Sequence, residues 1–565
     1  MSDTSIPLLE CVPNFSEGRD PAVIRRITDA IEAVPGARLL DVDPGKGTNR
    51  TVVTFVGPPD AVVEAAFQAI RTAADVIDMR THTGEHPRMG ATDVCPLVPI
   101  SGMTMAETVD CARTLGRRVG EALGIPVYLY EQAASRPERR NLATIRGGEY
   151  EGLAEKLARA EWAPDFGPAE LNPKSGATAI GARDFLVAYN INLNTTSTRR
   201  AYAVAYDLRE QGRIKREGDP VTGAVVRDAQ GEPVWIPGRL KGVKAIGWFI
   251  PEYGIAQVSM NLTNLAQTPL HTAFEEACRS ADARGLRVTG SELVGMVPLG
   301  VMLDAGRHFL RKQRRSLGIA EAEIIKIAVR SLGLDDLARF VPEQKIIEYR
   351  LRNDAAEPLL HATLADFADQ TASETPAPGG GSVAAYVGAL GAALATMVAN
   401  VSAHKRGWDA RWEAFSAWAE KGQASLATLG RLVDEDTRAF NAVLEAARLP
   451  QGTDAERQAR DAAIEAANRY AIEVPFRTMA ATLESMAVMQ AMAEMGAPEA
   501  ISDAGVGALC ARAAVVGAYL NVRINATNLR DRAFAAERLA AGAELVRQAE
   551  ALVREVLETV ERRLE

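Results

Sequence analysis

Apolar positions along the first 131 residues follow two alternating patterns. Short runs rich in β-branched residues alternate with segments in which apolar residues recur every three to four positions. The first pattern is typical of strands and the second of amphipathic helices. Strands are expected at 8–12, 38–42, 50–56, 94–100 and 126–130, and helices at 21–34, 60–77 and 105–123. This alternation predicts an α/β unit with one sheet covered by helices.

A second set of strand-like and helix-like patterns follows between residues 182 and 351. Strands are expected at 185–192, 245–250 and 256–262, with helices near 199–210 and 272–284. Between them, the stretch Arg216–Pro237 is rich in Gly, Pro, Asp and Lys, which favours a surface hairpin or a loop.

The amino-acid composition and the spacing of apolar residues change after the polar segment 353–358. Residues 380–565 are dominated by Ala, Leu, Glu, Arg and Met with long helical periodicity, which predicts an all-helical domain. The expected fold class is therefore multidomain, with two α/β subdomains followed by an all-α domain. The expected boundaries are 1–181, 182–351, a linker at 352–359, and 360–565. A chain of 565 residues is too long for a single core.

Charge and cysteine content narrow the function classes. The chain has 64 Lys and Arg against 73 Asp and Glu, a net charge of −9, so nothing favours a nucleic-acid partner. Its five cysteines are scattered and form no Cys-x-x-Cys pair, which favours a reducing compartment, and we expect the cytoplasm. We see no signal segment and expect no stretch of about 18 uncharged apolar residues, hence no membrane partner.

The loop 84–96 concentrates candidate chemistry. Of the chain's six histidines, His86 lies in this loop and His82 just before it. Pro87 biases His86 towards an extended conformation on a constrained loop. Such a histidine is either a general base or simply hydrogen-bonded to backbone. Their i, i+4 spacing resembles a zinc-binding helix, but Gly84 and Pro87 break that helix and no suitably spaced third ligand follows, so no metal is expected.

The helical part contains an acid within an apolar stripe. Asp436 occupies the vacant position of a series spaced at helical intervals: Leu426, Leu429, Val433, Phe440 and Leu444. It is either part of a structural network or a tuned acid or base. Asp434 is expected on the polar side with Arg431, Arg438 and Asn441.

Two further features accompany that acid. The glycine run at 379–381 meets an expected helix start, which suits either a ligand site or a close helix crossing. A polar cluster of Asn521, Arg523, Asn525 and Arg530 is placed to face Asp436 across a bundle.

Several long segments resemble known folate enzymes. Leu9–Gly18, Leu40–Asp43 with Thr48–Thr51, Gly84–Gly90, Trp162–Pro168 and Arg209–Arg213 resemble glutamate formimidoyltransferase. Pro378–Ser382 and Asp434–Asp436 resemble formimidoyltetrahydrofolate cyclodeaminase and the related methenyltetrahydrofolate cyclohydrolases. Together they resemble the bifunctional formimidoyltransferase-cyclodeaminase family over nearly the whole length, and Arg216–Pro237 looks like an insertion.

The resemblance implies transfer of the formimidoyl group of N-formimidoyl-L-glutamate to N5 of tetrahydrofolate. Ring closure by N10 then gives 5,10-methenyltetrahydrofolate and ammonia. Tetrahydrofolate, with or without a polyglutamate tail, is the acceptor substrate. The resemblance also implies a homo-oligomer built from dimers.

The resemblance implies that His86, Asp43 and Asp436 are the catalytic residues. It therefore favours a catalytic over a structural role for Asp436. The folate-contacting stretch comprises Gly167, Pro168, Ala169, Glu170, Leu171, Asn172, Pro173, Lys174, Ser175 and Gly176. Substrate contacts are also assigned to Gly379, Gly380, Gly381 and Ser382. Arg50 and Arg88 are candidate clamps for substrate carboxylates, because guanidinium pairs with carboxylate bidentately; an ordinary ion pair is the alternative for each.

Two other functions stay open at this point. One is a formyl transferase joined to a cyclohydrolase, which would use the same folate site but release water instead of ammonia in the second step. The other is a folate-binding scaffold in which one domain has lost activity.

Overall fold

The computed structural model describes residues 7–46, 48–84, 87–219, 222–251, 253–351, 359–527 and 529–565. Contacts divide the chain into two units, Met1–Val301 with Leu332–Arg350, and Met302–Ser331 with Leu351–Glu565. The second unit thus takes a segment from within the range 182–351 that the sequence suggested as one subdomain. Each unit is treated by itself below.

The first unit begins with an α/β layer. Among the described residues, seven strands form one sheet in the order β1-β4-β2-β5-β7-β6, with β3 beside β4. Their bounds are β1 Leu8–Cys11, β2 Asn14–Phe15, β3 Arg38–Gly45, β4 Arg50–Gly57, β5 Thr92–Ser101, β6 Val127–Glu131 and β7 Thr178–Ala182. β1, β3 and β4 pair antiparallel, whereas β7 runs parallel to both β5 and β6.

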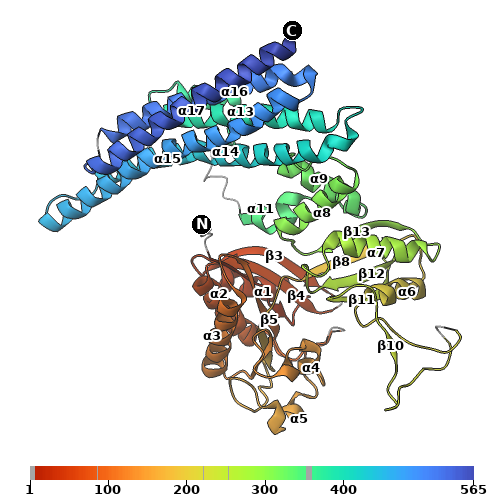
Figure 1. Cartoon of the computed structure of the whole chain (residues 1–565). Coiled ribbons are helices and arrows are strands. Elements are labelled where there is room, and N and C mark those ends of the chain that lie inside the picture. The colour runs from red at the N-terminus through yellow and green to blue at the C-terminus, as the bar shows by residue number, and fades with distance from the viewer. Residues whose placement is uncertain are drawn as a thin grey trace. The chain divides into compact units, whose positions relative to one another are not determined.

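Helices cover one face of this sheet. They are α1 Pro21–Glu32, α2 Pro59–Val76 and α3 Met105–Leu123, and their apolar stripes share one buried cluster with Leu9, Cys11 and Phe15 (Figure 1). Asp20 caps α1, and Thr104 with Glu107 forms a capping box on α3. The opposite sheet face, which carries Glu10 and Asn14, is left for the functional site. Two short helices, α4 Leu142–Arg146 and α5 Leu153–Leu157, follow β6.

A second sheet follows in the same unit. Within the described ranges its strands lie in the order β11-β12-β8-β13, all antiparallel. Their bounds are β8 Val187–Leu193, β11 Val243–Ile250, β12 Ile255–Leu262 and β13 Val288–Val294, and the covering helices are α6 Thr198–Leu208 and α7 Leu270–Asp282. The insertion Arg216–Pro237 extends a hairpin whose base pairs β9 Arg213–Ile214 with β10 Trp235–Ile236. The hairpin expected from the sequence is confirmed.

The second unit is helical. Its long helices run side by side in one bundle, where α13 contacts α14, α15 and α16 (Figure 1). The helices from α8 onward are α8 Leu299–Lys312, α9 Glu321–Leu332, α10 Pro342–Lys345, α11 Ile347–Leu351, α12 Leu364–Thr371, α13 Gly380–Ala403, α14 Trp412–Ala447, α15 Asp454–Met495, α16 Ile501–Ala526 and α17 Arg532–Leu564. Of these, α10 and α11 belong to the first unit up to Arg350. The fold class expected from the sequence is confirmed.

Residues 302–331 belong to this bundle through specific contacts. The backbone N–H of Leu317 donates to Ser416 Oγ over 2.9 Å, and Asn400 Nδ2 donates to the Gly318 carbonyl over 2.8 Å. Gly318 lies so close to Ala419 that a side chain at 318 would collide with it. The polar break at 353–358 lies outside the described residues.

The expectation that no long uncharged apolar stretch exists is wrong. Helix α13 comprises 24 residues without a charged side chain, and in the described part of the chain both Gly380–Ala403 and Pro498–Ala526 are long and apolar enough to cross a membrane. Alanine and glycine supply much of that composition, because α13 packs closely against its neighbours in the bundle. Core helices of soluble proteins have the same composition, so this is weak evidence for a membrane.

Candidate functional site

The loop before β5 is fastened by Asn49. Glu85 and His86 lie outside the described residues, but the loop is described up to Gly84. Asn49 Nδ2 donates to the Thr83 carbonyl over 2.9 Å, and its Oδ1 accepts from the Gly18 N–H over 3.0 Å. Asn49 has a φ of 47°, a left-handed conformation that asparagine tolerates better than most residues. Its side chain therefore fixes the approach of the chain to His86.

His82 is occupied by hydrogen bonds at both ring nitrogens. Nδ1 accepts from Arg88 Nε over 3.2 Å, which leaves Nε2 protonated and donating to the Asn49 carbonyl over 3.0 Å. Both ring nitrogens of His82 are thus engaged by the protein itself. The role of His86 in proton transfer stays a prediction.

Arg50 and Arg88 are both engaged by the chain's own carboxylates. Arg88 Nη1 and Nη2 lie 3.1 and 2.7 Å from carboxylate oxygens of Glu149 and Glu151. Arg50 is buried and pairs with Asp93 at 2.5 Å, with Arg146 on the same carboxylate. A substrate carboxylate would have to share these guanidiniums, and their role as clamps stays a prediction.

Asp93 also holds the far end of the loop. Its Oδ1 accepts from the backbone N–H of Met89 over 3.1 Å, while Arg50 Nε donates to Asn14 Oδ1 over 3.0 Å. Asn49 therefore holds the chain just before Gly84, and a buried ion pair holds it at Met89. Removal of one partner of such a pair leaves an uncompensated charge.

The predicted folate segment lies beside this loop. Met79 N–H donates to the Lys174 carbonyl over 2.9 Å and Ala91 N–H to the Ser175 carbonyl over 2.8 Å, while Gly90 forms a β-bridge with Gly176. A Cβ on Gly90 would collide with the carbonyls of Ser175 and Ala177. Positions 171–176 are thus brought to the loop that contains His86, whereas 167–170 are exposed.

Asp43 lines a cavity of about 300 Å³ on the open face of the first sheet. Strands β1 to β4 form one wall, and the second sheet and its connections form the other. The cavity is lined by Glu10, Val12, Asn14, Asp41, Asp43, Val52, Thr54, Arg183, Phe185, Leu186, Ala188, Asn261, Val294, Gly295 and Met296. The sequence analysis named Asp43 but missed Glu10 and Asp41. The signal was present, because Asp41 and Asp43 share a face of one strand and Glu10 interrupts an apolar strand.

The carboxylates of this cavity have unusual environments. Burial raises the pKa of Glu10 to about 7, with Glu348 adding to the rise and Arg183 opposing it. Burial also raises the pKa of Asp41, against the opposing charge of Lys345. Acids whose pKa is raised by burial next to a cavity are typical of functional sites.

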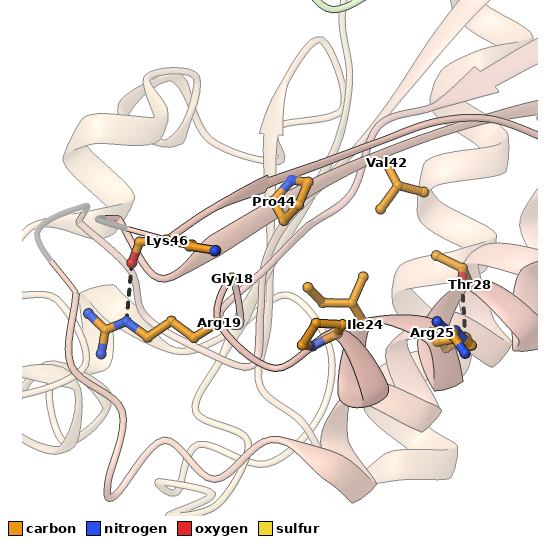
Figure 2. Close-up of a pocket in the computed structure, with 9 residues that line it drawn as sticks. Gly18, Arg19, Ile24, Arg25, Thr28, Val42, Pro44 and Lys46 are labelled. Carbon is orange, nitrogen blue, oxygen red and sulfur yellow. Dashed lines mark hydrogen bonds between the residues drawn. The ribbon is translucent and has the colours of Figure 1, made fainter. Parts of the chain in front are cut away.

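Two further hollows flank the same region. One, of about 520 Å³, is lined by His82, Thr83, Gly84, Arg88, Gly148, Glu149 and Glu151. The other, of about 260 Å³, has the cations Arg19, Arg25 and Lys46 around an apolar floor that includes Ile24 and Val42. Figure 2 shows the Lys46 amine ending between Pro44 and Gly18, and Arg19 Nε donating to the Lys46 carbonyl. Within the described ranges, none of the three cations has an ion-pair partner.

In the helical unit, the glycine run meets Asp436. Gly379 is the N-cap of α13, and Gly381 lies directly against the Asp436 carboxyl group. The Ser382 hydroxyl donates to the Val433 carbonyl over 2.8 Å and lies 3.2 Å from Asp436 Oδ2. Burial raises the pKa of Asp436, and the hydrogen bonds from Ser382 oppose that rise. The structure therefore brings together the helical residues that the sequence singled out.

The expected placement of Asp434 is wrong. It is 3% exposed, and its two carboxylate oxygens accept the backbone N–H groups of Leu359 and Leu360 over 2.9 and 3.0 Å. Phe440, assigned to the packed face, is 36% exposed. The predicted stripe is buried at Leu429 and Val433 but 36% exposed at both Phe440 and Leu444, so the predicted phase holds only for the first part of the stripe. Segment 359–360 covers the side of α14 that the sequence analysis assigned to solvent.

The second polar cluster is only partly at the site. The Asn521 amide lies next to Gly380, as expected for a residue that faces Asp436. Asn525 instead donates to the Ala471 carbonyl, and Arg530 pairs with Asp461. Two separate sites thus emerge, one in each unit.

Comparison with known proteins gives separate family matches for the part of the chain that contains each site. Residues 8–183 match the family described as "Formiminotransferase domain, N-terminal subdomain", 188–352 match "Formiminotransferase domain", and 363–544 match "Formiminotransferase-cyclodeaminase". The chain is 46% identical to Formimidoyltransferase-cyclodeaminase of Rattus norvegicus over 528 residues, 93% of this chain and 94% of the rat protein. The chain belongs to the formimidoyltransferase-cyclodeaminase family.

Each half of this family member also has a separate relative. Glutamate formimidoyltransferase of Streptococcus pyogenes serotype M1 is 41% identical over 304 residues, 54% of this chain and 93% of that protein. Methenyltetrahydrofolate cyclohydrolase of Methylorubrum extorquens is 40% identical over 198 residues, 35% of this chain and 95% of that protein. Among the described residues, no three His, Cys, Asp or Glu side chains gather to hold a metal ion.

Proposed function

We propose that the chain transfers the formimidoyl group of N-formimidoyl-L-glutamate to N5 of tetrahydrofolate and then cyclises the product to 5,10-methenyltetrahydrofolate with release of ammonia. The observation that carries this proposal is similarity over 93% of the chain to a formimidoyltransferase-cyclodeaminase. The two separate sites, one on the open sheet face and one at Asp436, support a two-step reaction.

In the first step, N5 attacks the amidine carbon. The bond from that carbon to N5 forms, the bond to the glutamate nitrogen breaks, and a proton moves from N5 to the departing nitrogen. His86 accepts and returns this proton, because an imidazole titrates near neutral pH. Asp43 orients the imidazole. Asn49 and Asp93 position the loop that contains His86 through the hydrogen bonds described above.

In the second step, N10 attacks the same carbon within one molecule, so the protein need supply no nucleophile. The protonated amidine has two hydrogens on its terminal nitrogen. The N10 proton is transferred to that nitrogen as the third, the carbon–nitrogen bond breaks, and ammonia leaves together with the methenyl cation. Asp436 moves this proton. Its buried position, which raises its pKa, favours a carboxyl that holds and returns a proton.

The similarity to a cyclohydrolase supports one alternative function. In that alternative the chain transfers a formyl group and then catalyses a hydrolase reaction. Purified protein would be incubated with tetrahydrofolate and either N-formimidoyl- or N-formyl-L-glutamate, with ammonia and methenyl absorbance measured together. We expect one ammonia per methenyl group formed from the formimidoyl donor. Methenyl formation only from the formyl donor, without ammonia, would contradict the proposal.

We also propose that the chain works as a homo-oligomer in the cytoplasm, without a metal. The packed helices α13 and α16 leave apolar side chains exposed, which suits contact with a second copy: Leu390, Met397, Val401, Val506, Leu509, Leu520 and Ile524. The five cysteines are free, which suits a reducing compartment. Light scattering of wild type and Leu509→Glu tests the assembly, and activity after EDTA treatment tests the metal.

A further inference from the structure

Glu10 is a buried carboxylate that the proposed mechanism does not use. It lies in β1, where Leu9 and Cys11 point into the apolar cluster beneath the sheet. Because strand residues alternate, Glu10 points to the other face, and it lines the cavity that contains Asp43. Glu10 is only 2% exposed.

No group in the described part of the chain satisfies this carboxylate. Among the described residues, none donates a hydrogen bond to its oxygen atoms, and none forms an ion pair with it. Arg183, also on the cavity wall, acts on it only at longer range. A carboxylate buried without a partner is costly, so its retention beside a cavity points to a ligand that supplies the missing donors.

The substrates of the proposed reaction carry a matching group. The formamidine group of the donor and the 2-amino-N3 edge of the tetrahydrofolate ring are both planar N–C–N units with two N–H donors on one edge. A carboxylate accepts two parallel hydrogen bonds from such an edge, as it does from a guanidinium. The apolar wall that Phe185, Leu186 and Met296 give this cavity suits a flat ligand.

We propose that Glu10 is a substrate-binding residue that accepts both hydrogen bonds from a planar N–C–N edge inside this cavity. The inference rests on the proposed function, since that reaction supplies the two ligands. The donor and tetrahydrofolate each carry such an edge, and binding experiments with each ligand alone distinguish them.

Ionisation of Glu10 should be coupled to this binding. The charged groups around it are Arg183, Glu348, Asp41 and Asp43, and burial raises its pKa to about 7. N–H donors favour the ionised form, so the ligand lowers that pKa and binding expels the proton. The wild type should therefore release protons when the ligand binds near neutral pH, and affinity should fall as the pH decreases.

The test is calorimetric titration of full-length wild type, Glu10→Gln and Glu121→Gln with each substrate alone, under anaerobic conditions for tetrahydrofolate. Glu121 is an exposed carboxylate on α3 and serves as the control. Glu10→Gln should weaken one ligand by about tenfold to a hundredfold and leave the other within about twofold, as loss of a charged hydrogen-bonded partner predicts. The ligand that weakens identifies the source of the N–C–N edge.

The same titrations in two buffers with different ionisation heats report proton release from the wild type, which does not depend on whether the variant folds. Unchanged affinity of Glu10→Gln for both ligands, or no proton release by wild type at pH 7, would overturn the assignment of Glu10. Equal weakening of both ligands together with a lower melting temperature would show a structural role instead. A wild type that neither binds nor transfers would overturn the proposed function itself.

Discussion

Gly381 lies against the carboxyl group of Asp436, so closely that a Cβ on residue 381 would overlap both carboxylate oxygens. The glycine at this position is therefore required by a close approach. Asp436 is the proposed acid of the second step. The backbone at the start of α13 therefore determines where its carboxyl group can lie.

Gly381→Ala should displace the Asp436 carboxyl group and slow ammonia release by about 10²-fold, the scale of a 1 Å misplacement. Transfer to N5 should be unchanged, because that site lies in the other unit. Gly517→Ala is the matched control, since its Cβ would meet only an ordinary contact with Ala384. Ammonia and 5-formimidoyltetrahydrofolate would be followed separately; equal rates for the two variants would contradict this role of Gly381.

Asp436→Asn should make 5-formimidoyltetrahydrofolate accumulate, with ammonia release lower by about 10²–10⁴. It should also stabilise the helical unit at neutral pH. A carboxyl whose folded pKa is raised contributes stability below its unfolded pKa and loses that contribution as the pH rises through the folded value. The difference between variant and wild type should therefore shrink towards pH 4, as urea unfolding at several pH values would show.

Asp434→Asn should behave in the opposite way. Asparagine keeps one acceptor but presents an N–H₂ group to the second backbone N–H, from Leu359 or Leu360, so the unfolding free energy should fall by about 1–3 kcal/mol. Ammonia release per folded molecule should stay close to wild type. Urea unfolding with activity measured on the folded fraction checks this, and a normal stability with lost deaminase activity would assign the chemistry to Asp434.

Asn49→Ala should slow transfer to N5 by about 10²-fold and leave the deamination of added 5-formimidoyltetrahydrofolate unchanged. The substitution removes the hydrogen bonds to Thr83 and Gly18 and disfavours the left-handed backbone at 49, so the loop with His86 loses its anchor. Steady-state rates with each substrate separate the two effects. Full transfer activity would mean that the Asp93 anchor suffices.

Cleavage in the predicted linker 352–359 should leave two pieces that remain associated. Residues 302–331 lie in the first piece but pack in the helical unit, through Leu317 with Ser416 and Gly318 with Asn400. Co-expressed 1–351 and 360–565 should therefore purify together on a tag carried by either one. Their separation into two soluble, active fragments would show that the 302–331 contacts are dispensable.

The sequence predicted elements better than their associations. Helix 105–123 agrees with α3 Met105–Leu123, and strand 256–262 lies within β12, because both carry strong periodicity and clear ends. The strand β7 Thr178–Ala182 was missed because the run Thr-Ala-Ile-Gly-Ala is short and weakly apolar and is held by pairing with β5 and β6. No local pattern encodes such a partner.

The candidate sites show the same limit. Periodicity placed Asp436 in one stripe with the buried Val433, but it could not reveal that Leu359 and Leu360 cover Asp434, since those residues lie about 75 positions away. Motifs located Asp43, whereas Glu10 becomes notable only when the two sheets enclose a cavity around it. The roles assigned to His86, Arg50 and Arg88 stay predictions.

Residues 302–331 interrupt the first unit in sequence but belong to the second unit, and this has a consequence for synthesis on the ribosome. The first unit is completed by Leu332–Arg350, so it can close before the helical unit exists. The apolar residues Leu310, Leu317 and Ile324 cluster with one another inside this segment, whereas Ser416, which accepts the backbone N–H of Leu317, follows Ser331 by about 85 residues. At about 5–20 residues per second, roughly 4 to 17 s pass before Ser416 is synthesised, so in the nascent chain this segment can form its own small cluster well before it can join the bundle.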